Sequence, residues 1–282
     1  MKLKLLFFFL IVIGFIFQLT ATEVSGLPDK FPKEGGAYTI RVNIEYPLYA
    51  KNGVEAWLFI PAGVSTKNVD TPVIIWYHGS TKDTQAYISL AKPWQKRAEN
   101  KKFIFISVQN WWSLSGDYTD GAIDSSQASQ AIIESLIQNG WIDGKNVFVT
   151  GFSAGGLTAV VTFLQNIPSF YEDGKPFLFH YSGLASFKGN YYQDPVLEPP
   201  FAAIDPEKSE NYREFIKNKL IWLSIGGKKD APRVLKQMPE FREYVRQYLL
   251  IEPIYKVYPD EGHFLSEQNF EDFWATVVSY LQ

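Results

Sequence analysis

Short, unbroken apolar runs alternate with helical patterns from residue 72 onward. Runs such as PVIIWY at 72–77 and FIFISV at 103–108 are typical of strands buried on both faces of a sheet. The strands expected on this basis are 72–77, 103–108, 146–150, 177–181, 220–224 and 253–258. The helices expected between or after them are 86–101, 125–138, 153–164 and 270–281. Because strands joined through helices run parallel, the sequence predicts an α/β fold with a mostly parallel central sheet and helices on both faces.

The segment before residue 72 has a different pattern. Two extended stretches, about 37–46 and 53–60, flank Asn52-Gly53, and Asn-Gly is a strong signal for a hairpin turn. We therefore expect an antiparallel N-terminal hairpin. Residues 22–36 are rich in glycine and proline and are expected to be an irregular lead-in. No linker interrupts 37–282, so we expect one domain there. Its proline-rich part, 183–219, is either a lid or a long connection.

The N-terminus has the pattern of a secretory signal peptide. Lys2 and Lys4 precede the apolar run Leu5–Phe17, which is shorter than the ~20 residues that a membrane-spanning helix needs. We expect residues 1–21 to be removed, with cleavage between 21 and 26, which predicts a secreted or periplasmic protein without a stable membrane span. The alternative is an uncleaved signal anchor that tethers the protein to the membrane.

One short motif carries chemistry. Gly151-Phe152-Ser153-Ala154-Gly155 is a Gly-X-Ser-X-Gly sequence that directly follows the expected strand 146–150 and directly precedes the expected helix 153–164. This is the setting of a nucleophile elbow, in which a strained turn exposes the serine hydroxyl above the sheet. The small residues on each side let neighbouring backbone pass close to the turn. We therefore expect Ser153 to be a catalytic nucleophile.

A serine needs a base, and the composition limits the choice. The chain has no cysteine, which excludes disulfides, thiolate metal sites and a cysteine nucleophile, and it has only three histidines. His263 follows the expected strand 253–258, so it lies at the same sheet edge as Ser153. His180 lies within an apolar run and is expected to be a core residue.

Lys and Arg number 27 against 30 Asp and Glu, so no excess of positive charge favours binding to nucleic acid.

The base needs a carboxylate that fixes its tautomer. Asp230 follows the expected strand 220–224, one strand before His263, and the order Ser153, Asp230, His263 is that of a Ser…Asp…His triad. Three other acids compete for this role. Asp205 precedes the strand and is expected at the opposite sheet end, and Asp260 and Glu261 are too near in sequence to reach behind the imidazole ring.

An oxyanion formed on a carbonyl carbon needs hydrogen-bond donors. The backbone N–H of Ala154, which follows the nucleophile, is one candidate, and the N–H of Ser80, in the loop after strand 72–77, is the second. His78 is expected to bind loop backbone and to play a structural part. This chemistry requires no metal and no organic cofactor.

With these motifs in place, the chain resembles serine hydrolases of the α/β-hydrolase superfamily over residues 37–282. The stretch GWIDGKNVFVTGFSAGG, residues 140–156, is similar to small secreted esterases of the polyhydroxybutyrate-depolymerase and feruloyl-esterase type, and also to prolyl-oligopeptidase-like peptidases. The resemblance implies an α/β-hydrolase fold and an exported enzyme that cleaves a small-molecule or polymer ester through an acyl-enzyme intermediate.

The substrate is not fixed by any motif. Trp111 and Trp112 follow strand 103–108 at the active edge, where they either stack on a sugar or phenolic ring or pack under the neighbouring helix. Tyr191 and Tyr192 are candidates for the opposite side of the site. Two other functions stay open, a prolyl-oligopeptidase-like serine peptidase and a non-catalytic binding protein on the same fold.

Overall fold

The computed structural model describes residues 22–45, 47–65, 71–110, 118–165, 181–191 and 216–282. Within these ranges the chain forms one nine-stranded sheet in the order β1-β2-β3-β5-β4-β6-β7-β8-β9. Its strands are β1 (Glu23–Ser25), β2 (Gly36–Asn43), β3 (Val54–Ile60), β4 (Val73–Tyr77), β5 (Ile104–Val108), β6 (Val147–Phe152), β7 (Gly183–Phe187), β8 (Leu220–Gly226) and β9 (Ile254–Tyr258).

The sheet has an antiparallel part and a parallel part. The pairs β1–β2, β2–β3 and β3–β5 are antiparallel, with Val54 of β3 opposite Val42 of β2 across the expected hairpin. Every pair from β5 through β4, β6, β7 and β8 to β9 is parallel. The carboxyl ends of six strands therefore lie at one edge of the sheet, as the sequence predicts.

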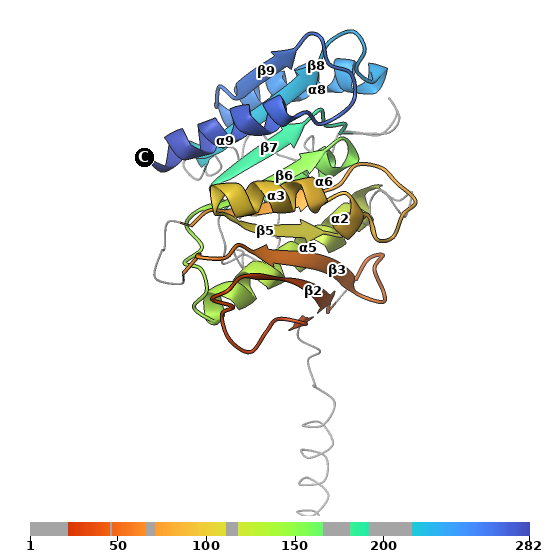
Figure 1. Cartoon of the computed structure of the whole chain (residues 1–282). Coiled ribbons are helices and arrows are strands. Elements are labelled where there is room, and N and C mark those ends of the chain that lie inside the picture. Colours follow the sequence, from red (N-terminus) through yellow and green to blue (C-terminus); the bar gives the residue numbers. More distant parts are fainter. Residues whose placement is uncertain (1–21, 46, 66–70, 111–117, 166–180, 192–215) are drawn as a thin grey trace, which may run out of the picture.

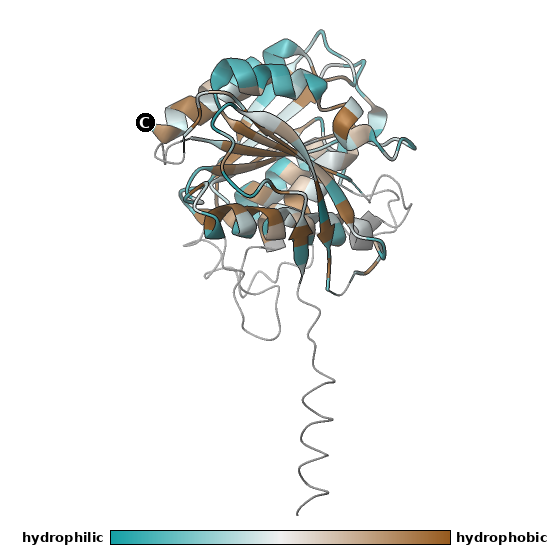
Figure 2. Ribbon diagram, turned by 60° about the horizontal axis from the view of Figure 1, so that its bottom comes forward, coloured by the Kyte–Doolittle hydropathy of each residue, from teal (hydrophilic) through white to brown (hydrophobic). Residues whose placement is uncertain are grey.

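Helices cover both faces of the sheet (Figure 1). The elements on one face are α5 (Tyr118–Gln138), α6 (Ala154–Gln165), α8 (Pro232–Tyr244) and its short π-helical extension η4 (Val245–Leu249), which pack mostly through aliphatic side chains. The other face is covered by α2 (Ala86–Ser89), α3 (Lys92–Lys101) and α9 (Glu267–Leu281), where the core is rich in tryptophan and phenylalanine. Figure 2 shows the apolar strands at the centre of the molecule, between these two layers.

Three sequence expectations are wrong in detail. The strand expected at 177–181 is not part of the described sheet: residues 177–180 lie outside the described residues, Tyr181 is not in a strand, and the paired strand is β7, Gly183–Phe187. The helix expected at 86–101 is interrupted, because Pro93 in the first turn of α3 has no N–H to donate to the preceding turn. The lead-in contains β1, a short edge strand whose Val24 pairs with Val42.

The composition of β7 explains why the pattern missed it. Its residues GLASF are mostly small, because α6 packs tightly on this strand. A Cβ atom added at Gly156 of α6 would lie 2.6 Å from Ser186 Oγ. A strand under such a close helix needs small side chains, whereas an apolar run is the signal that sequence analysis looks for.

In the part of the chain that is described, no helix is both long and apolar enough to cross a membrane. The expected signal peptide, residues 1–21, lies outside the described residues. The segment read as a lid or a long connection, 183–219, is described only at its two ends, where it supplies β7 and the residues before β8.

Candidate active site

Ser153 lies in a tight turn between β6 and α6. Its backbone has φ = 54°, a left-handed value that costs energy in a residue with a side chain. The turn depends on the flanking glycines: a Cβ atom at Gly151 would lie 1.9 Å from Gly155 O, and one at Gly155 would lie 2.0 Å from Tyr77 O. The strand–turn–helix context expected of a nucleophile elbow is therefore present. The N-terminus of α6 directly follows the serine, where free amides favour negative charge.

The structure brings Ser153, His263 and Asp230 into one hydrogen-bonded chain. His263 Nε2 lies 2.8 Å from Ser153 Oγ, and His263 Nδ1 lies 2.8 Å from Asp230 Oδ1. The three residues come from the ends of β6, β8 and β9, which the parallel sheet gathers at one edge. The Asp230 side chain is fully buried, whereas the His263 side chain is 30% exposed. Solvent therefore reaches this hydrogen-bonded series from the Ser153 end and not from the Asp230 end.

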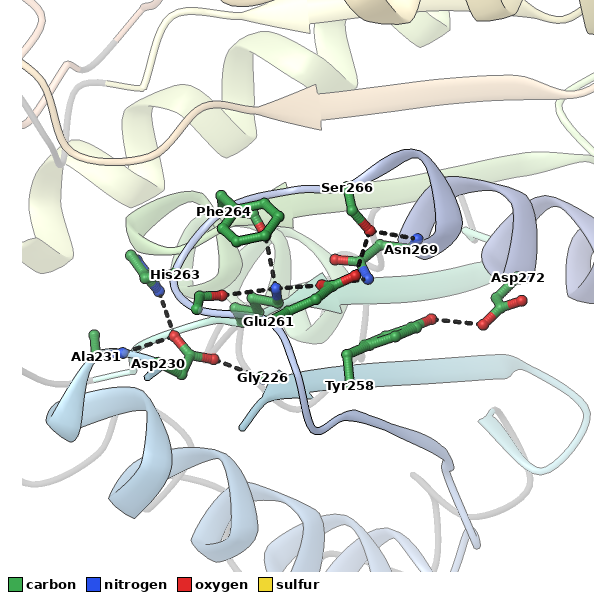
Figure 3. Close-up of polar contacts among 12 residues, drawn as sticks. Gly226, Asp230, Ala231, Tyr258, Glu261, His263, Phe264, Ser266, Asn269 and Asp272 are labelled. Carbon is green, nitrogen blue, oxygen red and sulfur yellow. Dashed lines mark hydrogen bonds and ion pairs between the residues drawn. The ribbon is translucent and has the colours of Figure 1, made fainter. Parts of the chain in front are cut away.

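Asp230 is held as an anion by its surroundings (Figure 3). Its Oδ2 accepts from Gly226 N at 2.7 Å, and its Oδ1 accepts from Ala231 N at 2.7 Å. Burial alone would raise the pKa of the Asp230 carboxyl, but the hydrogen bonds from His263, Gly226 and Ala231 outweigh it, so the pKa lies below its ordinary value. A carboxylate at this position fixes the proton of His263 on Nδ1 and leaves Nε2 free to accept.

The competing acids do not take this position. Asp260 is exposed, and Asp205 lies outside the described residues. Glu261 is turned toward Lys188, 2.7 Å away, and not toward the imidazole. Of Asp230, Asp260 and Glu261, the residue whose carboxylate faces His263 Nδ1 is therefore Asp230.

His78 has the structural environment that the sequence predicts. Its side chain is completely buried, its Nδ1 lies 2.8 Å from Gly79 O, and its Nε2 accepts from Asn110 N at 3.1 Å. Burial lowers the pKa of His78 to about 4, so the ring is neutral at physiological pH. Both ring nitrogens are occupied by backbone groups, which leaves none for proton transfer.

The loop after β4 passes directly beside the serine. A Cβ atom at Gly79 would lie 3.2 Å from Ser153 Cβ, so this glycine allows the close approach. Ser80 follows it and is exposed, and Ala154 is buried in the first turn of α6. Ala154 directly follows the serine and Ser80 follows the glycine that approaches it, and the roles of their N–H groups in an oxyanion hole stay a prediction.

A mostly apolar cavity of about 200 Å³ lies next to the same turn. It is lined by Gly79, Phe152, Trp76, Leu90 and Leu265, among others. Phe152 directly precedes the serine, and its ring centroid lies 5.0 Å from that of His263. Two residues that line the cavity, Gly79 and Phe152, therefore also lie beside Ser153 and His263.

Asn190 is not among the residues expected from the sequence, because the strand before it was expected at 177–181 and lies at Gly183–Phe187. Asn190 follows β7 at the active edge, is 7% exposed, and donates its N–H to Ser153 O at 3.2 Å. Ser153 Oγ also lies 3.4 Å from Asn190 Oδ1. Correct placement of β7 would have put this residue beside the serine.

Tyr191 does not line the site as expected. It is completely buried, and its hydroxyl lies 2.8 Å from Ser186 Oγ within the core. Trp111, Trp112, Tyr192 and His180 lie outside the described residues. Within the described ranges, no three histidine or acidic side chains cluster closely enough to hold a metal ion.

No known family model matches the sequence, and no curated protein is similar to it in sequence. Solved structures are similar in fold. Acyl-protein thioesterase 2 from Zea mays is 17% identical with a TM-score of 0.56, covering 80% of this chain and 99% of its own. Acetyl xylan esterase from Paenibacillus sp. R4 is 14% identical with a TM-score of 0.57, covering 95% of this chain and 91% of its own.

A peptidase is among the similar structures as well. Dipeptidyl peptidase 4 from Porphyromonas gingivalis is 13% identical with a TM-score of 0.54, and the match covers 81% of this chain but only 33% of the peptidase. These likenesses confirm the predicted α/β-hydrolase fold with its antiparallel N-terminal hairpin. The esterases among these structures share this fold with the chain.

Proposed function

We propose that the protein is an exported serine hydrolase that cleaves carboxylic esters through an acyl-enzyme intermediate. The observation that carries the proposal is the hydrogen-bonded chain from the buried Asp230 through His263 to Ser153 Oγ, with both contacts at 2.8 Å. The strained φ of Ser153 at a helix N-terminus supports it, because such turns occur at nucleophiles. Export is proposed from the apolar N-terminal run.

In the proposed reaction, Ser153 Oγ attacks the ester carbonyl carbon while His263 Nε2 takes its proton. The imidazolium that forms is stabilised by the Asp230 carboxylate, which stays ionised. His263 then returns the proton to the leaving alkoxide as the C–O bond breaks, and the alcohol departs. Water, deprotonated by His263, attacks the acyl-enzyme carbonyl, and the carboxylic acid is released when Ser153 recovers its proton.

The tetrahedral intermediate in each half-reaction carries a negative oxygen. The N–H groups of Ala154 and Ser80 are its proposed donors, one from the helix that follows the serine and one from the loop that Gly79 brings against it. Each such donor lowers the activation barrier by ~3–4 kcal/mol. The partial positive charge at the N-terminus of α6 acts on the same oxygen.

The cavity beside Phe152 supports an ester with a small apolar part. An apolar cavity of ~150 Å³ is large enough to hold benzene, so the space of about 200 Å³ here accommodates a short acyl chain or a single ring. In this proposal the apolar part lies against Leu90, Phe152 and Leu265 while the carbonyl carbon lies at Ser153 Oγ.

A serine peptidase is the second candidate, because the dipeptidyl peptidase that resembles this chain shares its fold. That likeness covers 33% of the peptidase, so it concerns only part of that protein. Comparable turnover of aminoacyl amides and esters would favour the peptidase. Ester turnover without amide turnover would favour the esterase.

The decisive experiment is fluorophosphonate labelling of the purified protein, with the modified residue identified by peptide mass spectrometry. We expect one adduct, on Ser153, and turnover of short p-nitrophenyl esters. The Ser153→Ala variant should lose both, by ~10⁴-fold or more in turnover, with an unchanged circular dichroism spectrum. Absence of labelling and of turnover in the wild-type protein would refute the proposal and favour a non-catalytic binding protein.

A further inference from the structure

We propose that Lys188 is a positioning residue: its buried ion pair with Glu261 fixes the loop that carries His263 relative to the turn that carries Ser153. This inference rests on the proposed function, because it concerns the geometry of the Ser153–His263 pair. Neither Lys188 nor Glu261 belongs to the expected catalytic residues. Glu261 was considered only as an alternative carboxylate partner for His263.

The surroundings of Lys188 are unusual for a lysine. Its side chain is completely buried. Its ammonium group donates three hydrogen bonds to the His263 loop: to Glu261 Oε2 at 2.7 Å, to Gly262 O at 2.8 Å and to Phe264 O at 2.7 Å. It also lies 4.8 Å from the centre of the Phe264 ring.

These contacts bracket the imidazole. Gly262 and Phe264 are the immediate chain neighbours of His263, and both of their carbonyl groups accept from the same Lys188 nitrogen. Two fixed carbonyls on either side of one residue define the direction in which its side chain leaves the backbone. A buried charge is costly unless all its hydrogen bonds are made, so the loop cannot move away from Lys188 without a large penalty.

Glu261 completes the attachment from the other side (Figure 3). Its carboxylate also accepts from Ser266 Oγ at 2.6 Å and from Asn269 Nδ2 at 3.0 Å. Burial would raise the pKa of Glu261, but the bonds from Lys188, Ser266 and Asn269 outweigh it, and the pKa lies below its ordinary value. The loop is thus fixed to the first turn of α9 as well as to Lys188.

The segment that supplies Lys188 also holds the serine. Phe187 O accepts from Ser153 N at 3.0 Å, and Asn190 N donates to Ser153 O at 3.2 Å. Lys188 itself has φ = 48°, a left-handed value, and its N–H donates to Ser224 O of β8 at 2.9 Å. Residues 187–190 therefore contact the Ser153 turn through the backbone and the His263 loop through the Lys188 side chain.

This arrangement gives the Ser153–His263 distance a physical cause. The two residues lie 110 positions apart in the chain, and their contact at 2.8 Å requires two separate loops to keep their spacing. A misplacement of ~1 Å at a reacting pair costs ~10²-fold in rate. One segment that binds both loops prevents this displacement.

The test compares Lys188→Met and Glu261→Gln with the wild-type protein in kcat, KM and the downfield proton NMR signal of the Asp230–His263 hydrogen bond. We expect kcat to fall by ~10- to 100-fold at little change in KM, and the downfield signal to broaden or shift. Glu261→Gln keeps the size of the side chain, so it tests the proposal if Lys188→Met does not fold.

Two controls separate positioning from general stability. Val277→Ala removes a buried methyl pair from α9, away from the loop, and should lower stability without changing kcat or the downfield signal. Lys101→Met breaks the exposed ion pair with Glu271 and should change neither kcat nor the downfield signal. All measurements are made at a temperature at which circular dichroism shows each variant to be folded.

The outcomes are distinct. If folded Lys188→Met and Glu261→Gln keep wild-type kcat and an unchanged downfield signal, Lys188 is only a stabilising residue and the inference is wrong. The same holds if Val277→Ala lowers kcat equally. If the wild-type protein is neither labelled by fluorophosphonate nor active on esters, the proposed function fails, and this inference fails with it.

Discussion

Two histidine loops lie at the same edge of the sheet, and they have opposite chemical characters. His78 follows β4 and His263 follows β9, and each has a glycine beside it. His78 is completely buried, and its two nitrogens face backbone groups of Gly79 and Asn110. His263 is partly exposed, and its two nitrogens face a carboxylate and a hydroxyl.

The difference teaches what makes an imidazole a base. Burial lowers the pKa of His78 to about 4 and keeps the ring neutral, because it outweighs the Gly79 carbonyl and the Asp83 charge, which act in the opposite direction. The Asp230 carboxylate beside His263 can stabilise the imidazolium, and the accessible Nε2 side leaves room for a substrate. Residue type and sheet edge are shared by the two loops, so burial and hydrogen-bond partners make the difference.

The largest expected effect comes from making the His263 surroundings more like those of His78. Asp230→Asn replaces the charged partner by a neutral amide that can donate to Nδ1, which turns the Nε2 proton toward Ser153. We expect kcat for a p-nitrophenyl ester to fall by ~10³- to 10⁴-fold with KM little changed. Wild-type turnover in Asp230→Asn would show that another acid, such as Asp205, orients His263.

The next effect concerns His78 and is one of stability. Between pH 6.5 and about 4, the unfolded chain binds a proton at this residue and the folded chain does not, so the free energy of unfolding falls as pH decreases. The slope is ~1.4 kcal/mol per pH unit, and the loss amounts to about 3 kcal/mol over this window. Above pH 6.5 the contribution is fully present.

Urea unfolding at several pH values between 7 and 4 measures this loss, with His78→Gln as the matched variant. Glutamine offers a donor and an acceptor but does not titrate, so its curve should lack the His78 contribution, and the difference between the two curves isolates it from other groups. Parallel curves for the two proteins would contradict a depressed pKa at His78. Wild-type kcat in folded His78→Gln would sharpen the contrast with His263.

The smallest effect separates side chain from backbone in the loop that His78 supports. Ser80→Ala removes an exposed hydroxyl and keeps the N–H, so kcat should change by less than about twofold. Ser80→Pro removes the N–H and should lower kcat by ~10²-fold. Equal activity of Ser80→Ala and Ser80→Pro, both folded by circular dichroism, would move the second oxyanion donor elsewhere.

Much of the fold and of the candidate site could be predicted because the signals are local. An apolar run of strand length marks β4, β5 and β6 without reference to the rest of the chain. The Ser153 turn is encoded by adjacent residues, since Gly151 and Gly155 leave the space that their neighbours occupy. Asp230 and His263 could be chosen because parallel strands place their following loops at one edge.

The features that could not be predicted from the sequence depend on contacts between segments that are distant in the chain. The place of β7 was missed because the close packing of α6 makes small residues favourable there, and no local pattern reports this. Asn190 and Lys188 were missed for the same reason, since they follow that strand. Tyr191 was expected to line the site and is instead buried against Ser186.

The sequence by itself determined the class of sheet, the tight turn at Ser153 and the order of the three residues that the structure brings together. Only the tertiary structure decided that Glu261 pairs with Lys188 while Asp230 pairs with His263, and that His78 stays neutral. The physical reason is the distance in sequence between the interacting groups. Turn geometry and strand burial follow from neighbours in the chain, whereas the charge state of a buried group is set by whichever distant atoms the fold places around it.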